Sequence, residues 1–200
     1  MTSEQPDKII PGEDLVGFWM QPGFVEGMIA DGKLFGSLEE TYRHLFRRNT
    51  EYAVFLWNGI PVRLDYRTDI PVLIGGLIEL WKNLLEKQDL SPVLFHLKTP
   101  NFETEWLVSG KPDRIDIEAH WKTIAGNYES ALNLLNILRM SRMDFLCEWK
   151  LLLEQLIRAV QESEAILTTS VAEQQYEMLV EFAAKIPHRG RFYQYETREQ

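Results

Sequence analysis

The feature that most constrains the fold of this chain is a strict alternation of apolar and polar residues over positions 114–122. Isoleucine, alanine and tryptophan occupy every second position there, and charged side chains or a histidine lie between them. A period of two is that of a β-strand with one face buried and the other in water. Half-exposed strands of this kind occur mainly in antiparallel sheets. The segment therefore predicts an antiparallel sheet with a charged outer face.

Turn signals and apolar runs place the rest of this sheet within residues 51–124. The dipeptide Asn58-Gly59 separates two apolar-rich runs, and its tolerance of positive φ is typical of a type I′ hairpin turn. A second group of runs leads up to the alternating segment. We expect a mostly antiparallel sheet of about five strands, a hairpin plus a three-strand meander, over residues 51–57, 60–67, 92–98, 101–109 and 114–124.

The position of the last turn of the meander sets which residues face each other across its final two strands. With the turn centred on the Lys111–Pro112 bond, Glu105 faces Glu118. By the same register Glu103 faces His120. The residues that then share the buried face are Phe102, Thr104, Trp106, Val108, Ile115, Ile117, Ala119 and Trp121.

Helix signals lie on both sides of the sheet region and dominate the last third of the chain. Ser37 and Glu40 form a capping box, and Asp69 caps a long apolar helix. We interpret Gly75-Gly76 within that helix as a point of close packing against the sheet, since a helical glycine costs about 1 kcal/mol against alanine. The last third is expected to form three helices, over 128–140, from Ser141 onward, and from Ser170 to Lys185.

These elements predict an α+β fold, because no strand–helix–strand crossover pattern indicates a parallel sheet. We expect a single domain over residues 13–186, with a sheet region at 51–124 and a helical region at 127–186. A polar, flexible N-terminal arm precedes it at 1–12, and a polar tail follows it at 187–200.

Charge and composition disfavour several classes of protein. The formal charge of −9 works against binding to nucleic acid or to an anionic membrane. No apolar run approaches about 18 residues and the first residues contain no apolar signal region, so we expect a soluble, cytoplasmic protein. The single cysteine, Cys147, excludes an intramolecular disulfide and is expected to be a small buried side chain in a helix.

No catalytic, nucleotide-binding or metal-binding motif is present in the sequence, and we expect no cofactor. The nearest approach to a site is a pair of histidines, His96 and His120, that fall on the predicted outer face near Glu103 and Glu105. Such a group suits a metal ion or general acid–base chemistry in principle. A solvated charged face explains the same residues, since every half-exposed strand displays one. We adopt this second interpretation.

Two acidic surfaces are the candidate partner-binding sites. One is the outer sheet face, where Lys98 and Lys122 are expected to relieve part of the charge, and the other is the last helix, where glutamates recur at i, i+4 and i+8. Like charges at this spacing repel by roughly a few tenths of a kcal/mol, so local helix stability does not favour the arrangement. A basic partner explains it, and so does chance. The candidate residues are Glu103, Glu105, Asp116 and Glu118 on the sheet, and Glu173, Glu177 and Glu181 on the helix.

A small, acidic, tryptophan-rich chain without a catalytic motif resembles the bacterial immunity proteins, which neutralise toxic effector domains. The resemblance implies a non-enzymatic cytosolic binding protein that engages a basic protein partner through an acidic surface. The alternative is a small-molecule-binding domain or small enzyme, with a pocket between sheet and helices lined by Trp57, Trp106 or Trp121. Self-association through the C-terminal helices is a third hypothesis, and the sequence does not set the oligomeric state.

Overall fold

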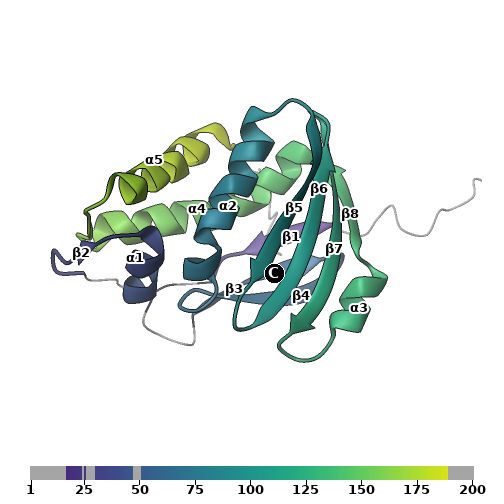
Figure 1. The fold of residues 1–200 in the computed structure, drawn as a ribbon, viewed down its shortest axis with the longest axis horizontal. Coiled ribbons are helices and arrows are strands. Elements are labelled where there is room, and N and C mark those ends of the chain that lie inside the picture. The colour runs from purple at the N-terminus through teal and green to yellow at the C-terminus, as the bar shows by residue number, and fades with distance from the viewer. Residues whose placement is uncertain (1–16, 24, 26–29, 47–50, 189–200) are drawn as a thin grey trace, which may run out of the picture.

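The computed structural model describes residues 17–23, 25, 30–46 and 51–188, and within them it contains five helices and nine strands (Figure 1). Seven of these strands form two antiparallel sheets, and the other two form a short parallel ladder. The predicted α+β class is confirmed. The predicted N-terminal arm and the part of the predicted tail beyond His188 lie outside the described residues.

The first sheet has the strand order β1–β3–β4 and contains the predicted hairpin. In it β1 (Phe18–Gln21) pairs with β3 (Tyr52–Trp57), which pairs with β4 (Ile60–Asp65). Asn58 and Gly59 join the two hairpin strands with φ values of 46° and 84°. These left-handed conformations are the ones that a type I′ turn requires. The hairpin was predictable because its turn chemistry is local.

The second sheet has the order β5–β6–β7–β8 and contains the predicted meander. Its strands are β5 (Leu90–Lys98), β6 (Phe102–Gly110), β7 (Arg114–Ile124) and β8 (Ile137–Ser141). All the residues that the alternation placed on the inner face of β6 and β7 are buried. The period-two pattern therefore identified the faces of these strands correctly.

The register between β6 and β7 differs from the prediction by two residues. Glu105 faces His120 rather than Glu118. Glu103 faces Thr123 rather than His120, because an irregularity between Glu103 and Thr104 displaces this pair by one further residue. The cause is the turn, in which Lys111 and Arg114 exchange backbone hydrogen bonds, so that its centre lies one residue later than expected. An even shift leaves each side chain on its own face, which is why the buried set was still correct.

The hairpin and the meander belong to two sheets that pack face to face, not to one sheet. In Figure 1, strands β5 to β8 lie in front of β1, β3 and β4 and cross them. Buried aromatic rings fill the space between the sheets. The ring centroids of Trp57 and Trp106 are 5.2 Å apart, and those of Phe55 and Trp121 are 6.3 Å apart. The alternation marks which face of a strand is buried, but it does not say which strands are neighbours.

Four helices gather beside the sheets (Figure 1) and bury further apolar surface. They are α1 (Leu38–Leu45), α2 (Ile70–Glu86), α4 (Arg142–Glu162) and α5 (Ser170–Lys185). Phe18 of β1 joins α4 to the first sheet, because its ring centroid lies 4.7 Å from that of Phe145 and 5.3 Å from that of Trp149. Cys147 is buried in α4, in agreement with the sequence.

The segment 128–140 is not a single helix, contrary to the prediction. The helix α3 (Glu129–Leu134) stops early, and the chain continues as β8, which pairs with β7 over five residues. Leu138 of β8 is fully buried. Tertiary pairing therefore outweighs the helical spacing of the leucines in this segment. The region 127–186 consequently holds strands as well as helices.

Two details of α2 also differ from the sequence interpretation. Gly75 and Gly76 do not approach the sheet closely, since a Cβ atom built at either position meets no atom within 4 Å. Asp69 stands at the N-cap of α2, but its side chain caps no N–H of that helix. Its carboxylate instead accepts hydrogen bonds from Asp65 N and from Asn101 Nδ2. Asp69 therefore ties the end of β4 to the β5–β6 turn.

Candidate interaction surfaces

The outer face of the second sheet carries carboxylates that are paired with cations from neighbouring strands. Glu105 Oε1 lies 2.6 Å from Lys122 Nζ and 3.2 Å from His96 Nδ1. Glu103 Oε2 lies 2.9 Å from Lys98 Nζ, and its Oε1 lies 3.6 Å from Lys122 Nζ. These five side chains come from β5, β6 and β7, so the network crosses three strands.

The pKa values in this network reflect the mutual stabilisation of its charges. The hydrogen bond from Lys98 is the main reason that the pKa of Glu103 is lowered, and Lys122 lowers the pKa of Glu105 in the same way. The pKa of Lys122 is raised in turn, mainly by its hydrogen bond with Glu105. At neutral pH the carboxylates of this network are therefore ionised and locally compensated.

Asp116 is compensated as well, whereas Glu118 is not. Asp116 Oδ1 lies 2.7 Å from Arg114 Nη2 and 3.3 Å from Arg139 Nε. Glu118 is exposed and forms no ion pair within the described part of the chain. Three of the four carboxylates predicted on this face thus have a cationic partner in the protein itself.

The predicted acidic stripe on α5 is exposed at all three of its glutamates. Glu181 Oε1 lies 2.5 Å from Lys185 Nζ, and this hydrogen bond raises the pKa of Lys185. Glu173 and Glu177 have no cationic partner among the residues that the structure describes. The N-terminal half of the stripe therefore carries two uncompensated charges.

The start of α5 is held by two short strands that the sequence did not reveal. The strand β2 (Leu34–Phe35) pairs in parallel with β9 (Ile166–Leu167). The N-cap of α5 is Thr169, one residue before the predicted start of the helix. Its hydroxyl oxygen accepts a hydrogen bond from Ala172 N, and its hydroxyl group donates to Gly36 O at 2.8 Å. The ladder and the cap together fix the N-terminus of α5 beside the end of β2.

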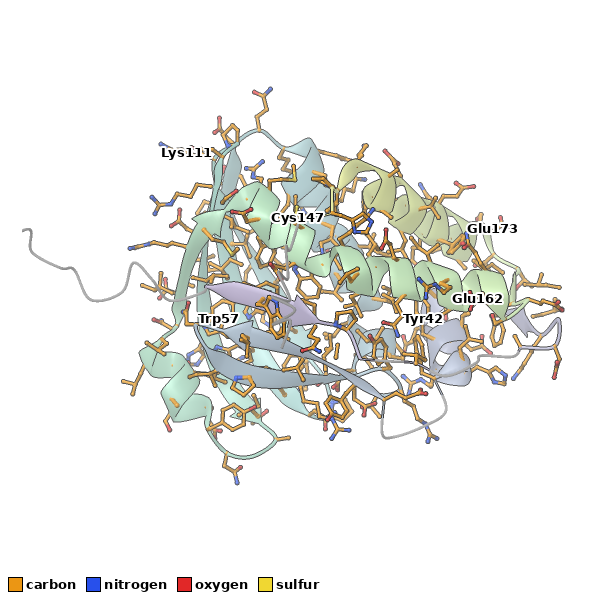
Figure 2. The ribbon with its side chains drawn as sticks, turned by 180° about the vertical axis from the view of Figure 1, so that it is seen from behind. Tyr42, Trp57, Lys111, Cys147, Glu162 and Glu173 are labelled. Atoms are coloured by element: carbon orange, nitrogen blue, oxygen red, sulfur yellow. The ribbon has the colours of Figure 1, made fainter. Side chains whose placement is uncertain are left out.

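Further carboxylates gather near this point, and we call the surface that they form the acidic end. Ala30 N donates to Ser163 O at 2.8 Å, which brings the turn at Asp31 beside the C-terminus of α4. Figure 2 shows Glu162 and Glu173 at the same end of the molecule. The carboxylates of the acidic end, which are exposed and form no ion pair within the described residues, are Asp31, Glu162, Glu164, Glu173 and Glu177.

Apolar side chains and a few cations complete the surface of the acidic end. Leu34 and Ile166 face each other across the β2–β9 ladder and are exposed, as is Val171 in the first turn of α5. Lys33 lies near Leu34 and is engaged by His44, since its Nζ is 3.4 Å from His44 Nδ1. Within the described residues, the surface therefore combines exposed apolar groups with unpaired carboxylates.

A hollow of about 310 Å³ near the end of β4 is lined by both polar and apolar side chains, and Asp65 is the carboxylate among them. Asp65 accepts hydrogen bonds from the backbone N–H groups of Arg67 and Thr68. The buried Asp69 beneath it is bonded to Asp65 N and Asn101 Nδ2. The residues that line the hollow are Arg63, Asp65, Thr68, Asn101, Ile124, Ala125 and Tyr128. The carboxylates of Asp65 and Asp69 therefore stabilise the junction of β4, α2 and the β5–β6 turn.

The tryptophans that the alternative hypothesis placed around a pocket lie in the core instead. Trp57, Trp106 and Trp121 are buried. Trp57 contacts both of the others, with centroid distances of 5.2 Å and 5.8 Å. Their rings fill the space between the two sheets and do not line the hollow near the end of β4.

The predicted histidine group does lie on the outer sheet face. Glu105 stands between His96 on β5 and His120 on β7 in the strand register. Within the described residues, however, no three histidine, cysteine or acidic side chains are placed so that they can hold a metal ion.

The chain matches no family model, no curated protein and no solved structure. Among the described helices, none has the length and apolar character needed to cross a membrane. The functional argument therefore rests on the placement of side chains.

Sequence reasoning missed the carboxylates that join Glu173 and Glu177 at the acidic end. A usable signal was the segment 161–184, which holds five glutamates and no lysine or arginine. Asp31 belongs to the same surface but lies far away in the sequence. The β2–β9 ladder and the hydrogen bond from Ala30 N to Ser163 O bring it there.

Proposed function

We propose that this protein is a non-enzymatic, cytoplasmic binding protein that engages a basic protein partner through the acidic end. One observation carries the proposal. Glu173 and Glu177 are exposed and have no cationic partner in the described residues, whereas Glu103 and Glu105 are paired with Lys98, Lys122 and His96.

The difference in pairing matters because a partner's cation competes with cations that the protein already supplies. A lysine or arginine that approaches Glu105 must displace Lys122. At Glu173 and Glu177 the same lysine or arginine displaces only water and counter-ions. Complementary charge of this kind raises the association rate and selects the partner.

The apolar side chains of the acidic end support the same proposal. Leu34, Ile166 and Val171 are exposed among the carboxylates. Stable interfaces commonly surround an apolar centre with a polar rim. We therefore propose a partner surface with apolar side chains flanked by lysine and arginine, of the kind that an effector domain neutralised by an immunity protein would present.

The test compares two double variants with the same net charge. Glu173→Gln with Glu177→Gln removes two charges from the acidic end, and Glu103→Gln with Glu105→Gln removes two from the sheet face. Each immobilised variant and the unchanged protein are exposed to native lysate at low salt. Retained proteins are eluted at about 0.5 M salt, where charge attraction is screened within about 4 Å.

We expect a basic protein to be retained by the unchanged protein and by the sheet-face variant, and released by high salt. The acidic-end variant should lose most of it. Purified partner then gives dissociation constants, and the acidic-end variant should bind about tenfold more weakly. Equal loss in both variants, or loss only in the sheet-face variant, would overturn the proposal.

A further inference from the structure

A second surface, remote from the acidic end in the fold, has an apolar row that crosses the whole second sheet. The strand register aligns Leu94 on β5, Leu107 on β6, Glu118 on β7 and Ile137 on β8. Neighbouring strands are about 4.8 Å apart, so the row is about 14 Å long. The three apolar members are 51%, 40% and 47% exposed. We call these four residues the sheet row.

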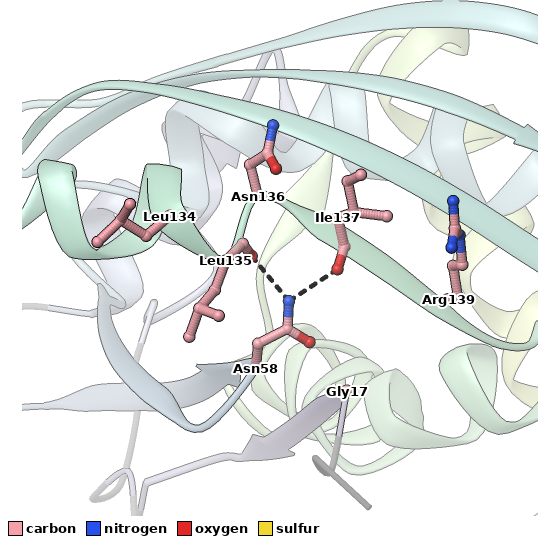
Figure 3. Close-up of a pocket in the computed structure, with 7 residues that line it drawn as sticks. All are labelled: Gly17, Asn58, Leu134, Leu135, Asn136, Ile137 and Arg139. Carbon is pink, nitrogen blue, oxygen red and sulfur yellow. Dashed lines mark hydrogen bonds between the residues drawn. The ribbon is translucent and has the colours of Figure 1, made fainter. Parts of the chain in front are cut away.

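The sheet row ends at a hollow of about 310 Å³ on the outer edge of β8 (Figure 3). Asn58 Nδ2 donates to Leu135 O at 2.7 Å and to Ile137 O at 2.9 Å. These bonds tie the hairpin turn to the segment that forms the wall, so the hollow is already formed in the free protein. Leu134 on its rim is 84% exposed. The lining residues are Gly17, Asn58, Leu134, Leu135, Asn136, Ile137 and Arg139.

The charges around the sheet row are balanced, except for one. On one side Glu105 is paired with Lys122, and on the other Asp116 is paired with Arg139. Glu118 lies within the row and forms no ion pair in the described part of the chain. The surface therefore offers a partner apolar contacts with a single uncompensated negative charge among them.

We infer that the sheet row and its hollow are a docking surface for an amphipathic helix with one lysine or arginine in its apolar stripe. The partner helix should carry a cation because Glu118 lacks a counter-charge in the described residues, and it should carry an apolar stripe because the leucines and the isoleucine of the sheet row are exposed. The spacing favours a helix, because one helical turn rises 5.4 Å, close to the separation of the strands. Apolar residues at i, i+4 and i+11, with the cation at i+7, then follow the row.

A second copy of this chain fits the sheet row less well. A two-fold arrangement sets Glu118 against the same glutamate or against a leucine of the second copy. Either contact leaves a carboxylate without a counter-charge in an apolar interface, which is unfavourable. The surface therefore indicates a different partner. It also stands apart from the proposed function, because it uses none of the carboxylates of the acidic end.

The test uses two synthetic, stapled helices of roughly 15 residues, long enough to present the whole stripe. One carries leucine at i, i+4 and i+11 with lysine at i+7, and its twin carries glutamate at i+7. Both are titrated by fluorescence anisotropy against the unchanged protein and against Glu118→Lys. Glu173→Lys serves as the control, because it changes the net charge equally at the acidic end. Thermal unfolding of each variant confirms that it is folded.

We expect the unchanged protein and Glu173→Lys to prefer the lysine helix by about tenfold, and Glu118→Lys to prefer the glutamate helix. Leu107→Ser should weaken both helices. The inference is overturned if neither helix binds, or if the preference does not invert in Glu118→Lys. It is also overturned if Glu173→Lys inverts the preference as strongly, since the effect then follows net charge.

Discussion

The outer face of the second sheet and the acidic end carry comparable numbers of carboxylates, but only the sheet face compensates most of them. On the sheet, Glu103, Glu105 and Asp116 each have a cation within 3 Å. At the acidic end, Glu173 and Glu177 have none among the described residues. Similar acidity therefore occurs in two different settings, because one surface pairs most of its carboxylates with cations of neighbouring strands and the other leaves its carboxylates unpaired within the described residues.

The difference has a geometric cause. In a sheet, side chains opposite each other on neighbouring strands lie about 5 Å apart, so a glutamate on β6 meets cations from β5 and β7. On α5 the neighbours at i±4 of Glu177 are Glu173 and Glu181. A helix surface thus brings together residues that are close in sequence, and here they carry the same charge.

The largest effect is expected in the core beneath the sheet face. Trp106→Ala should lower the free energy of unfolding by about 3–5 kcal/mol, because it opens a cavity between the two sheets. Leu34→Ala at the acidic end should change it by less than about 0.5 kcal/mol, since Leu34 is 61% exposed. Chemical denaturation measures both. Similar losses in the two variants would mean that the acidic end belongs to the core of the fold.

The second effect concerns the pH dependence of the sheet region. Burial raises the pKa of Asp69 in the folded state, although hydrogen bonds from Asn101 and from Asp65 N act against the shift. A raised folded-state pKa contributes stability that is present below the unfolded pKa and is lost as pH rises through the folded pKa. The stability of the unchanged protein relative to Asp69→Asn should therefore increase as pH falls.

Glu103 and Glu105 act in the opposite sense, because their pKa values are lowered. Their contribution is present above the unfolded pKa and is lost as pH falls through the folded one. They are unchanged in Asp69→Asn, so they cancel in the difference between the two proteins. Denaturation from about pH 7 to about pH 4 measures that difference. A difference that stays constant or shrinks on acidification would contradict the role of Asp69.

The smallest changes in stability are expected when a single charge is removed from either surface. Lys122→Gln should destabilise the protein slightly, and the loss should shrink at about 0.5 M salt, because Lys122 bridges Glu103 and Glu105. Glu177→Gln should stabilise it by roughly 0.2–0.5 kcal/mol, since it removes repulsion from Glu173 and Glu181. Thermal unfolding at the two salt concentrations tests both. A loss of stability in Glu177→Gln would show that this carboxylate supports the fold.

The predictions that the structure confirms depended on neighbours in the sequence, although not every local prediction was correct. The hairpin at Asn58-Gly59 followed from turn chemistry, and the buried face of β6 and β7 followed from alternation. The cap at Ser37 is also confirmed, because its side chain accepts a hydrogen bond from Glu40 N. The exposed stripe on α5 followed from helical spacing.

Predictions that depended on distant partners were incomplete or wrong. The leucines of 128–140 have helical spacing, but residues 137–141 form a strand that pairs with β7. The register of Glu105 moved because the turn after β6 is centred one residue later than expected. The acidity of the sheet face and the two cations that relieve it, Lys98 and Lys122, were visible in the sequence. Which carboxylate each cation meets depends on the strand register, which the sequence did not give.

The sequence by itself determined the α+β class, the hairpin and meander, and the side of each meander strand that is buried. These properties come from interactions across a few positions, namely turn dihedrals, helix caps and the period of apolar residues. Tertiary structure decided that the strands form two sheets, and that Asp31 joins Glu162 and Glu173 at one end. It also left Glu118 unpaired beside paired neighbours. Those outcomes depend on contacts between residues far apart along the chain, and no local pattern sets such distances.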